Sequence, residues 1–398
     1  MRKLIYLFLG IALISCSTVE EEPQITIAGG AECSEKSDAS VIGNNRVSNI
    51  GSLLKGAGFE GKNVDEDNIT PILGEKSSRG ECDTLLYIAP FENGDGYAII
   101  SAKPIENEVL AVVDNGKYGV NENPSFDFFI ELSKDYVRSS DMGNQSRAQV
   151  KQWSTTKVLI DEKVEPRVSV EWGQTGIYGM ECPNYISGCS NTAAAQALTY
   201  FKVPSQMKLT YRNDELLNLD WENIANHVNY NCNCDYTIHS DIAKLMRQLG
   251  EMSESTYEQN ATSTQTTNTR NTLIKLGLKC DKISEYNKSA YNIFSKLKNN
   301  DGIFMMRGSA KNSGTNNEYV GHAWIVPGAK YTLIEYTHYV EEAGSGEIKI
   351  DDKGQTELTY LYINWGYDGD NNGYFQQDIF KVGNYTYDKD VKFYFVSK

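Results

Sequence analysis

Hydrophobic and polar positions alternate differently in the two halves of the chain. In the first half, short apolar runs lie at 84–89, 97–101 and 109–113, and the turns 93–96 and 114–116 are rich in Asn, Asp and Gly, which is the pattern of antiparallel strands. A stretch over 124–138 begins with Pro and repeats apolar residues every three or four positions, which predicts a helix. These elements predict a small α+β domain. The domain contains no His, which argues against acid–base chemistry within it.

The second half begins with helical patterns and ends with strands. Helices are expected from Cys189 onward, over 240–249 and over 290–297. Helices followed by an antiparallel sheet predict an α+β fold for this half as well. The runs that predict the strands are 303–306, 319–326, 331–340, 358–365 and 391–396.

A polar segment separates the two halves. Residues 139–155 carry Gly, Asn, Gln and Ser near their start and show no apolar periodicity. We interpret this segment as an exposed linker and a good target for proteolysis.

The N-terminus carries an export pattern. Arg2 and Lys3 precede an apolar run over 4–14, which is too short to span a bilayer as a stable helix. The run ends in Leu-Ile-Ser-Cys16, which resembles the lipobox of bacterial lipoproteins, where the Cys thiol is lipidated. An ordinary signal peptide with a Cys near its cleavage site is the alternative. Residues 17–48 are polar and aperiodic, so we expect a flexible tether.

Composition limits the class of protein. The chain has 398 residues, more than one compact core usually needs, so two domains are expected. The 25 Tyr and 33 Gly favour strands and turns. The formal charge of −15 repels phosphate backbones, which argues against nucleic acid as a partner.

The eight Cys do not form a recognisable metal site. Cys232 and Cys234 have no second Cys pair or spaced His pair, although His239 is near in sequence. A Ca²⁺ loop beginning at Asp368 fails because its twelfth position is Ile379 instead of Glu. We therefore expect no metal. Leaving out the expected lipidated and catalytic Cys, six Cys remain, and the sequence does not choose their pairing.

Three segments carry candidate chemistry. Cys189 opens an Ala-rich helical stretch, and the partial positive charge of a helix N-terminus favours a thiolate there. His322 lies in an apolar strand, where its polar atoms need partners. Asn364 and Trp365 end a later strand, where they would orient the imidazole and shield it from water. Each segment alone also fits an ordinary structural role.

Together these segments give the order Cys, His, Asn along the chain, which is typical of papain-type peptidases. Cys189 is then the nucleophile and His322 the general base. Gln174 lies upstream of the Cys, where papain-like enzymes place the Gln that donates to the oxyanion, and this resemblance implies the backbone N–H of Cys189 as the second donor.

The chain resembles the streptopain family of bacterial cysteine peptidases. The resemblance implies a papain-like α+β catalytic domain preceded by a small α+β inhibitory prodomain. The sequence departs from the family pattern at Ser190 and Asn191, directly after the nucleophile, and at Tyr367 and Asp368, where the family usually has Trp-Gly. The segments that carry the resemblance are 188–196, 321–324, 364–366, 172–174, 182–183, 245–257 and, in the first domain, 96–101.

These observations predict a secreted or surface-anchored cysteine endopeptidase made as a zymogen. It needs no cofactor, and its expected partners are protein or peptide substrates and its own prodomain. It is expected to touch the membrane only through a lipid anchor. Two alternatives stay open: an inactive surface lipoprotein that uses the fold for adhesion or inhibition, and a transglutaminase-like acyl transferase. The expected division is signal peptide 1–16, tether 17–48, prodomain 49–140, activation linker 141–160 and catalytic domain 161–398.

Overall fold

The computed structural model describes residues 49–76, 82–103, 105–120, 123–140, 151–230, 235–283, 291–311, 319–341, 347–381 and 391–398. Three predicted features lie wholly or partly outside the described residues: the signal peptide with Cys16, the tether 17–48, and the first part of the linker, residues 141–150. Among the described residues, no helix is both long enough and apolar enough to cross a membrane.

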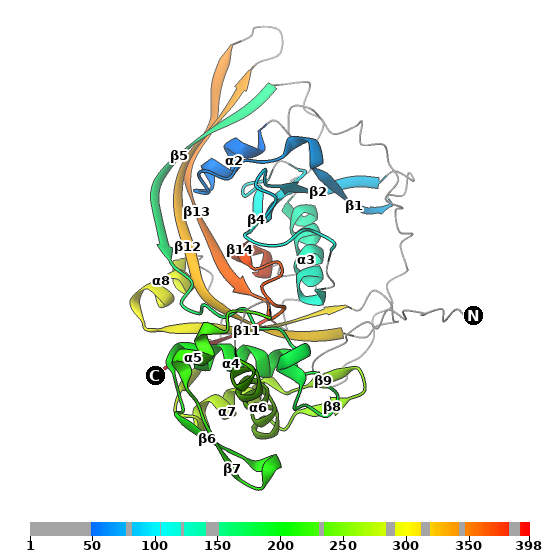
Figure 1. Cartoon of the computed structure of the whole chain (residues 1–398). Helices are drawn as coiled ribbons and strands as arrows, with labels where there is room; N and C mark the ends of the chain where they lie inside the picture. The colour runs from blue at the N-terminus through cyan, green and yellow to red at the C-terminus, as the bar shows by residue number, and fades with distance from the viewer. Residues whose placement is uncertain are drawn as a thin grey trace, which may run out of the picture.

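One antiparallel sheet runs through most of the molecule (Figure 1). Its eleven strands follow the order β1-β2-β3-β4-β14-β13-β12-β11-β15-β10, and β5 pairs with the part of β12 that extends beyond β11. The bounds are β1 Thr70–Lys76, β2 Cys82–Pro90, β3 Tyr97–Ser101, β4 Val109–Val113, β5 Lys151–Val164, β10 Lys279–Ile283, β11 Gly302–Lys311, β12 Tyr319–Glu341, β13 Ile348–Asn364, β14 Gly373–Gln376 and β15 Lys392–Ser397.

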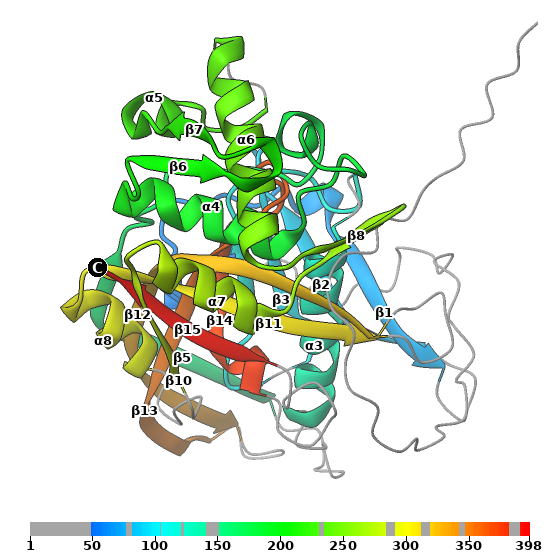
Figure 2. The ribbon, with the colours of Figure 1, turned by 90° about the horizontal axis from the view of Figure 1, so that it is seen from below.

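Helices cover both faces of this sheet, and two small hairpins extend from the helical lobe (Figures 1 and 2). The α-helices are α2 Ile50–Gly56, α3 Pro124–Ser140, α4 Cys189–Phe201, α5 Trp221–Asn226, α6 Tyr236–Met252, α7 Thr266–Lys275 and α8 Tyr291–Asn299. The hairpin strands are β6 Gln206–Leu209, β7 Glu215–Asn218, β8 Thr256–Glu258 and β9 Ala261–Ser263, and short 3₁₀ turns cover Glu66–Asn68, Gly176–Gly179, Thr210–Arg212 and Gln377–Lys381.

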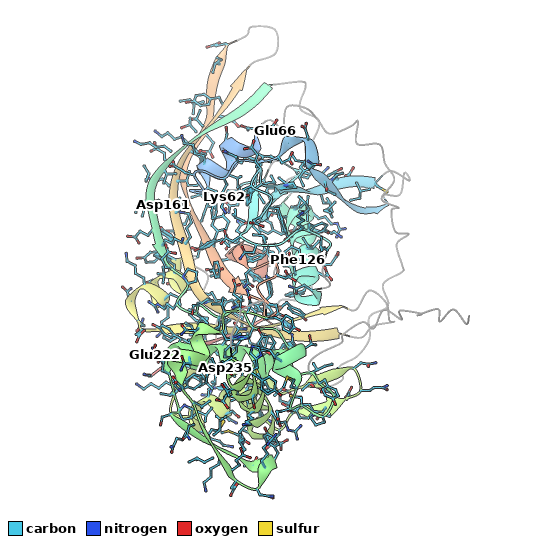
Figure 3. The ribbon with its side chains drawn as sticks, in the orientation of Figure 1. Lys62, Glu66, Phe126, Asp161, Glu222 and Asp235 are labelled. Carbon is cyan, nitrogen blue, oxygen red and sulfur yellow. The ribbon has the colours of Figure 1, made fainter. Side chains whose placement is uncertain are left out.

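The alternation of side chains along β11 explains the layered core. Ile303 and Met305 face the helices of the lower lobe, whereas Phe304 and Met306 face the opposite core, which contains α3. Successive strand residues point to opposite faces, so one apolar strand serves two cores. Figure 3 shows Phe126 among the side chains of the upper lobe, and Glu222 and Asp235 in the lower lobe.

The predicted prodomain and the predicted catalytic domain share this sheet and two of its cores. Strand β4 pairs with β14, with Val113 opposite Gly373. Phe129 of α3 packs against Phe375 of β14 with ring centroids 4.8 Å apart. The same core contains Trp365, next to the predicted imidazole-orienting Asn. The two parts are therefore joined by strand pairing and by aromatic packing, beyond their covalent link.

Most sequence-predicted elements coincide with structural ones. The ranges of β3 and β4 agree fully with prediction, and the two runs at 319–326 and 331–340 form the single long strand β12. The second part of the predicted linker differs, since residues 151–164 form β5. Its many polar residues suit an edge strand that is largely exposed, so their composition resembles that of a linker.

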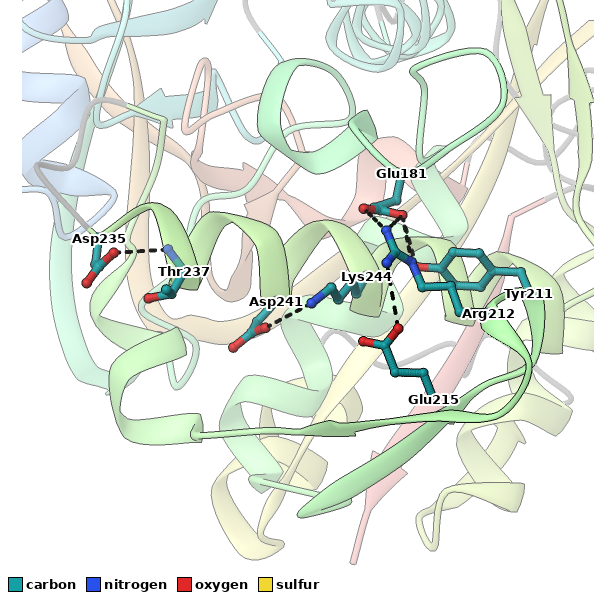
Figure 4. Close-up of polar contacts among 8 residues, drawn as sticks. All are labelled: Glu181, Tyr211, Arg212, Glu215, Asp235, Thr237, Asp241 and Lys244. Atoms are coloured by element: carbon teal, nitrogen blue, oxygen red, sulfur yellow. Dashed lines mark hydrogen bonds and ion pairs between the residues drawn. The ribbon is translucent and has the colours of Figure 1, made fainter.

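Polar contacts fix the helical lobe around the segment before Cys189. Asp235 caps α6 by accepting from the N–H of Thr237 at 3.0 Å (Figure 4). Arg212 forms a two-pronged ion pair with Glu181, with Nη2 2.6 Å from Oε1 and 2.8 Å from Oε2. This pair ties the turn after β6 to the residue that precedes Cys182.

Candidate active site

Cys189 is the first residue of α4, as predicted. Gly188 caps the helix with φ of 86°, and a Cβ there would lie 3.0 Å from Thr262, so both backbone and space require Gly. The side chain of Cys189 is buried, with 1% exposed. The unpaired N–H groups of the first turn stabilise negative charge at this position, which favours a thiolate once the sulfur is free.

The sulfur of Cys189 is disulfide-bonded in this structure. Cys82 is disulfide-bonded as well, whereas Cys182 and Cys280 are buried free thiols. A disulfide sulfur does not ionise and does not attack a carbonyl. The predicted nucleophile therefore lies on its helix as expected, but its sulfur is held in a disulfide and cannot react as a thiolate. The sequence did not reveal this disulfide.

His322 lies on β12, opposite Gly308 of β11. Its Nε2 is 2.8 Å from the carbonyl oxygen of Trp365, and because that oxygen only accepts, Nε2 carries the proton. The ring is 7% exposed. Burial lowers the pKa of His322 to about 4, although the bond to the Trp365 carbonyl acts in the opposite direction. The imidazole is thus neutral near pH 7 in this arrangement.

Two aromatic rings pack on the imidazole of His322. Trp324 stacks at 5.9 Å between centroids with an interplanar angle of 18°, and Tyr367 lies at 5.4 Å with an angle of 33°. Tyr367 is one of the positions that depart from the family pattern. The sequence indicated that Tyr367, directly after Asn-Trp-Gly, lies at the edge of the active site, and the structure adds its contact with the His322 ring.

The side-chain amide of Asn364 forms its hydrogen bonds with groups other than His322. Its Nδ2 donates to the carbonyl of Val170 at 2.8 Å, and its Oδ1 accepts from the N–H of Gly366 at 3.1 Å. The side chain therefore shapes the turn after β13 and holds it to the segment before Trp172. The hydrogen bond between this turn and His322 comes from the backbone of Trp365 and not from the amide of Asn364.

Trp365 is fully buried and packs in the core instead of covering His322. Its ring centroid lies 5.0 Å from that of Trp324 and 5.1 Å from that of Phe375. Its indole Nε1 is buried with no hydrogen-bond partner among the described residues. The predicted shield of the imidazole is thus indirect, acting through Trp324.

Gln174 is held directly beside the segment that leads to the nucleophile. Its backbone oxygen accepts from the N–H of Ser187 at 2.9 Å, which places it two residues from Cys189 in the neighbouring segment. The side chain is 7% exposed, and its Nε2 is buried with no hydrogen-bond partner among the described residues. A buried donor without an acceptor is costly, so the free amide is consistent with an acceptor that arrives with substrate.

The described residues contain no group of three His, Cys, Asp or Glu side chains arranged to hold a metal ion. The predicted lipidation site Cys16 lies outside the described residues. In the structure, Gln174 thus lies beside the segment that leads to Cys189, and His322 is hydrogen-bonded to the backbone carbonyl of Trp365.

The model of the peptidase C10 family matches residues 172–375, a segment that contains Cys189, His322 and Asn364. The chain belongs to this family. Its membership confirms the resemblance to streptopain, and the chain is a cysteine peptidase by family. No curated protein sequence matches it significantly.

Two solved structures share the fold. A fragment of the interpain A precursor from Prevotella intermedia aligns with a TM-score of 0.55 at 19% identity, covering 82% of this chain and 98% of the fragment. Active interpain A from the same organism aligns with a TM-score of 0.41 at 21% identity, covering 59% of this chain and 94% of that one. The first match confirms the predicted α+β, papain-like fold with a preceding domain.

Proposed function

We propose that this C10 peptidase is a cysteine endopeptidase made as a zymogen, with Cys189 as nucleophile and His322 as general base. The observation that carries the proposal is the position of Cys189 at the N-terminus of α4, beside Gln174 with its unpartnered buried amide. A thiolate needs a stabilising environment, and a tetrahedral intermediate needs donors for its oxyanion. The helix N-terminus at Cys189 and the amide of Gln174 would meet these two requirements once Cys189 is reduced.

The reaction follows from these positions. The Cys189 thiolate attacks the carbonyl carbon of a peptide bond, and the negative charge moves to the carbonyl oxygen. Gln174 Nε2 and the backbone N–H of Cys189 donate to that oxygen. His322, protonated in the ion pair with the thiolate, gives its proton to the leaving amine. Water, deprotonated by His322, then hydrolyses the thioester and restores Cys189. No cofactor takes part in these steps.

Two features support a latent state. His322 is neutral and donates to the Trp365 carbonyl, so it is not engaged as an ion-pair partner of the thiolate. Cys189 is oxidised. Activation then requires reduction of Cys189 and release of Nε2 from the carbonyl.

The first domain touches the strand of His322 and the loop after Trp365. Phe128 of α3 lies over Gly308, directly opposite His322, and packs against Trp324 with centroids 6.4 Å apart. Tyr97 of β3 donates to Oδ1 of Asn371 at 2.7 Å. A prodomain held this way restrains the residues that must move for activation, which supports an inhibitory role.

We also propose export to the cell envelope through lipidation of Cys16, with protein or peptide substrates outside the cell. Labelling cells with a fatty acid should mark the wild-type precursor and leave Cys16→Ala unmarked and released from membranes. A wild-type precursor that is secreted but unlabelled would indicate export by an ordinary signal peptide without lipidation of Cys16.

The main rival is an inactive lipoprotein that keeps the fold for adhesion or inhibition. A transglutaminase-like acyl transfer is the second, and it uses the same nucleophile. The unpartnered amide of Gln174 favours a catalytic use over both a purely adhesive and an inhibitory one.

One experiment tests the proposal. The reduced protein is treated with an epoxysuccinyl thiol-peptidase probe, the modified residue is mapped by peptide mass, and casein cleavage is followed with and without an added amine. We expect modification at Cys189, cleavage that Cys189→Ala lacks, and free carboxylate products. Cleavage by Cys189→Ala at the wild-type rate would remove the assignment, and products joined to the amine would favour acyl transfer.

A further inference from the structure

Asp368 brings a carboxylate to the irregular segment that carries Gln174. It stands in the loop after Trp365, at a position where a small residue is usual in the family pattern, and it adopts a left-handed backbone with φ of 54°. We propose that Asp368 is a positioning residue that holds the Gly173–Gln174 segment, and so the oxyanion donor, in place. The inference rests on the proposed peptidase function.

The carboxylate lies directly against Gly173. A Cβ at Gly173 would be 2.3 Å from Oδ2 and 2.9 Å from Cγ of Asp368, so only Gly allows this approach. The carboxylate accepts hydrogen bonds from the Tyr178 hydroxyl and from the backbone N–H groups of Gly173 and Tyr230. One side chain therefore connects the loop after Trp365 to three other segments.

Helix α4 and the residue Ser187 just before it also hold this segment. Thr192 donates to the Gly173 carbonyl at 3.2 Å, Gln196 donates to the Trp172 carbonyl at 3.3 Å, and Ser187 donates its N–H to the Gln174 carbonyl. All three of these bonds use backbone oxygens. Asp368 binds the N–H of Gly173, so it supplies the restraint that α4 does not.

The setting of Asp368 is costly for a carboxylate. Its Oδ1 is buried without a partner, and in the described part of the chain no Lys, Arg or His forms an ion pair with it. Burial raises its pKa, and the nearby Asp370 acts in the same direction. Natural proteins keep such unfavourable groups chiefly where function needs them, so the cost argues for a functional role.

The expected effect is on the transition state. The oxyanion forms only after attack, so a shift of Gln174 weakens a bond that the bound substrate does not yet make. Loss of Asp368 should therefore lower kcat and leave KM nearly unchanged. The reaction of the Cys189 thiolate with iodoacetamide has no oxyanion, so its rate should be unaffected.

The test compares Asp368→Ala and Asp368→Asn with the wild-type chain, and uses Asp370→Ala as the matched control two residues away. Each protein is reduced and brought to the same processed fraction, verified by intact mass. We then measure kcat and KM on a peptide substrate and the alkylation rate of Cys189.

We expect Asp368→Ala to lower kcat roughly 10- to 100-fold, with KM and the alkylation rate within about threefold of wild type. Asp368→Asn keeps an accepting oxygen, so it should recover most of kcat, and Asp370→Ala should match wild type. Unchanged kcat in Asp368→Ala, an equal loss in the alkylation rate, or Asn behaving no better than Ala would each overturn the inference. A wild-type chain that is alkylated at Cys189 but cleaves nothing would overturn the proposed function itself.

Discussion

The Nε2 atom of His322 donates to the carbonyl oxygen of Trp365, the residue that directly follows Asn364. The imidazole is thereby bound to the backbone of the very turn whose side chain was predicted to orient it. Rotation of the ring, or a shift of this turn, frees Nε2. The bond therefore links the protonation of His322 to the loop on which the first domain rests.

The first prediction concerns the general base. His322→Ala should lower kcat/KM on peptide substrates by roughly 10²- to 10⁴-fold, because proton transfer to the leaving amine is lost. His338→Ala is a matched control, since His338 lies on the same strand β12. It should retain activity close to wild type. An inactive His338→Ala beside an active His322→Ala would contradict the assignment of the base.

The second prediction concerns the oxidised nucleophile. Without reductant, iodoacetamide should leave Cys189 unmodified in the folded precursor, and a dithiol should restore both alkylation and activity, because thiolate attack on the disulfide releases Cys189 as the leaving thiolate. Peptide mapping of the alkylated residues before and after reduction measures this. Cys280 is the internal control, since it is a buried free thiol whose pKa burial raises to about 12, so its labelling should not follow reduction. Full labelling of Cys189 without reductant would contradict the prediction.

The sequence predicted the features of the site that depend on neighbouring residues, but not those that depend on contacts between segments distant in sequence. The placement of Cys189 on a helix terminus and of His322 on a strand follows from local patterns, so both were predicted. The hydrogen bond of His322 to Trp365, the disulfide state of Cys189 and the contact of Asp368 with Gly173 depend on how distant segments meet. No local periodicity carries that information.

The fold was also predicted well where local patterns determine it and less well where distant segments pair. Strands β3 and β4 were predicted to the residue because each is a short apolar run between turns. Residues 151–160 of strand β5 were predicted as linker, because an exposed edge strand keeps many polar residues and its partner, β12, lies more than a hundred residues further on. The prediction of a division at 141–160 remains, but its second part is structured in the precursor.

The third prediction concerns pH. Burial lowers the pKa of His322 to about 4, below its usual value near 6.5, so His322 resists protonation in the folded state. The stability that this neutral His contributes is present above pH 6.5 and is lost as pH falls from 6.5 toward 4. At about 1.4 kcal/mol per pH unit, the loss is on the order of 3 kcal/mol.

Thermal unfolding of the Cys189→Ala precursor between pH 7.5 and pH 4 tests this expectation. The unfolding temperature should fall with acid, and His322→Gln in the same background should reduce the slope. His227 is buried, with its pKa lowered to about 4 by burial and by His239, so part of the slope should remain. Identical slopes with and without His322 would show that this His does not contribute.

The last prediction concerns activation. We expect the cut that separates the predicted domains to fall within 141–150, before β5, because β5 is paired with β12 over Lys151–Val164 and a protease needs an extended, unpaired segment. The mature enzyme should therefore begin near residue 151 and keep β5.

After the cut, the first domain should stay bound, since β4 pairs with β14 and Phe129 packs on Phe375. Intact-mass measurement during maturation, combined with size-exclusion chromatography, checks both points. Phe129→Ala should weaken the complex of the cut parts, whereas Glu131→Ala, whose side chain is exposed on the same helix in an ion pair with Lys134, should not. A first cleavage inside 151–164, or parts that separate at once in wild type, would contradict this account of the zymogen.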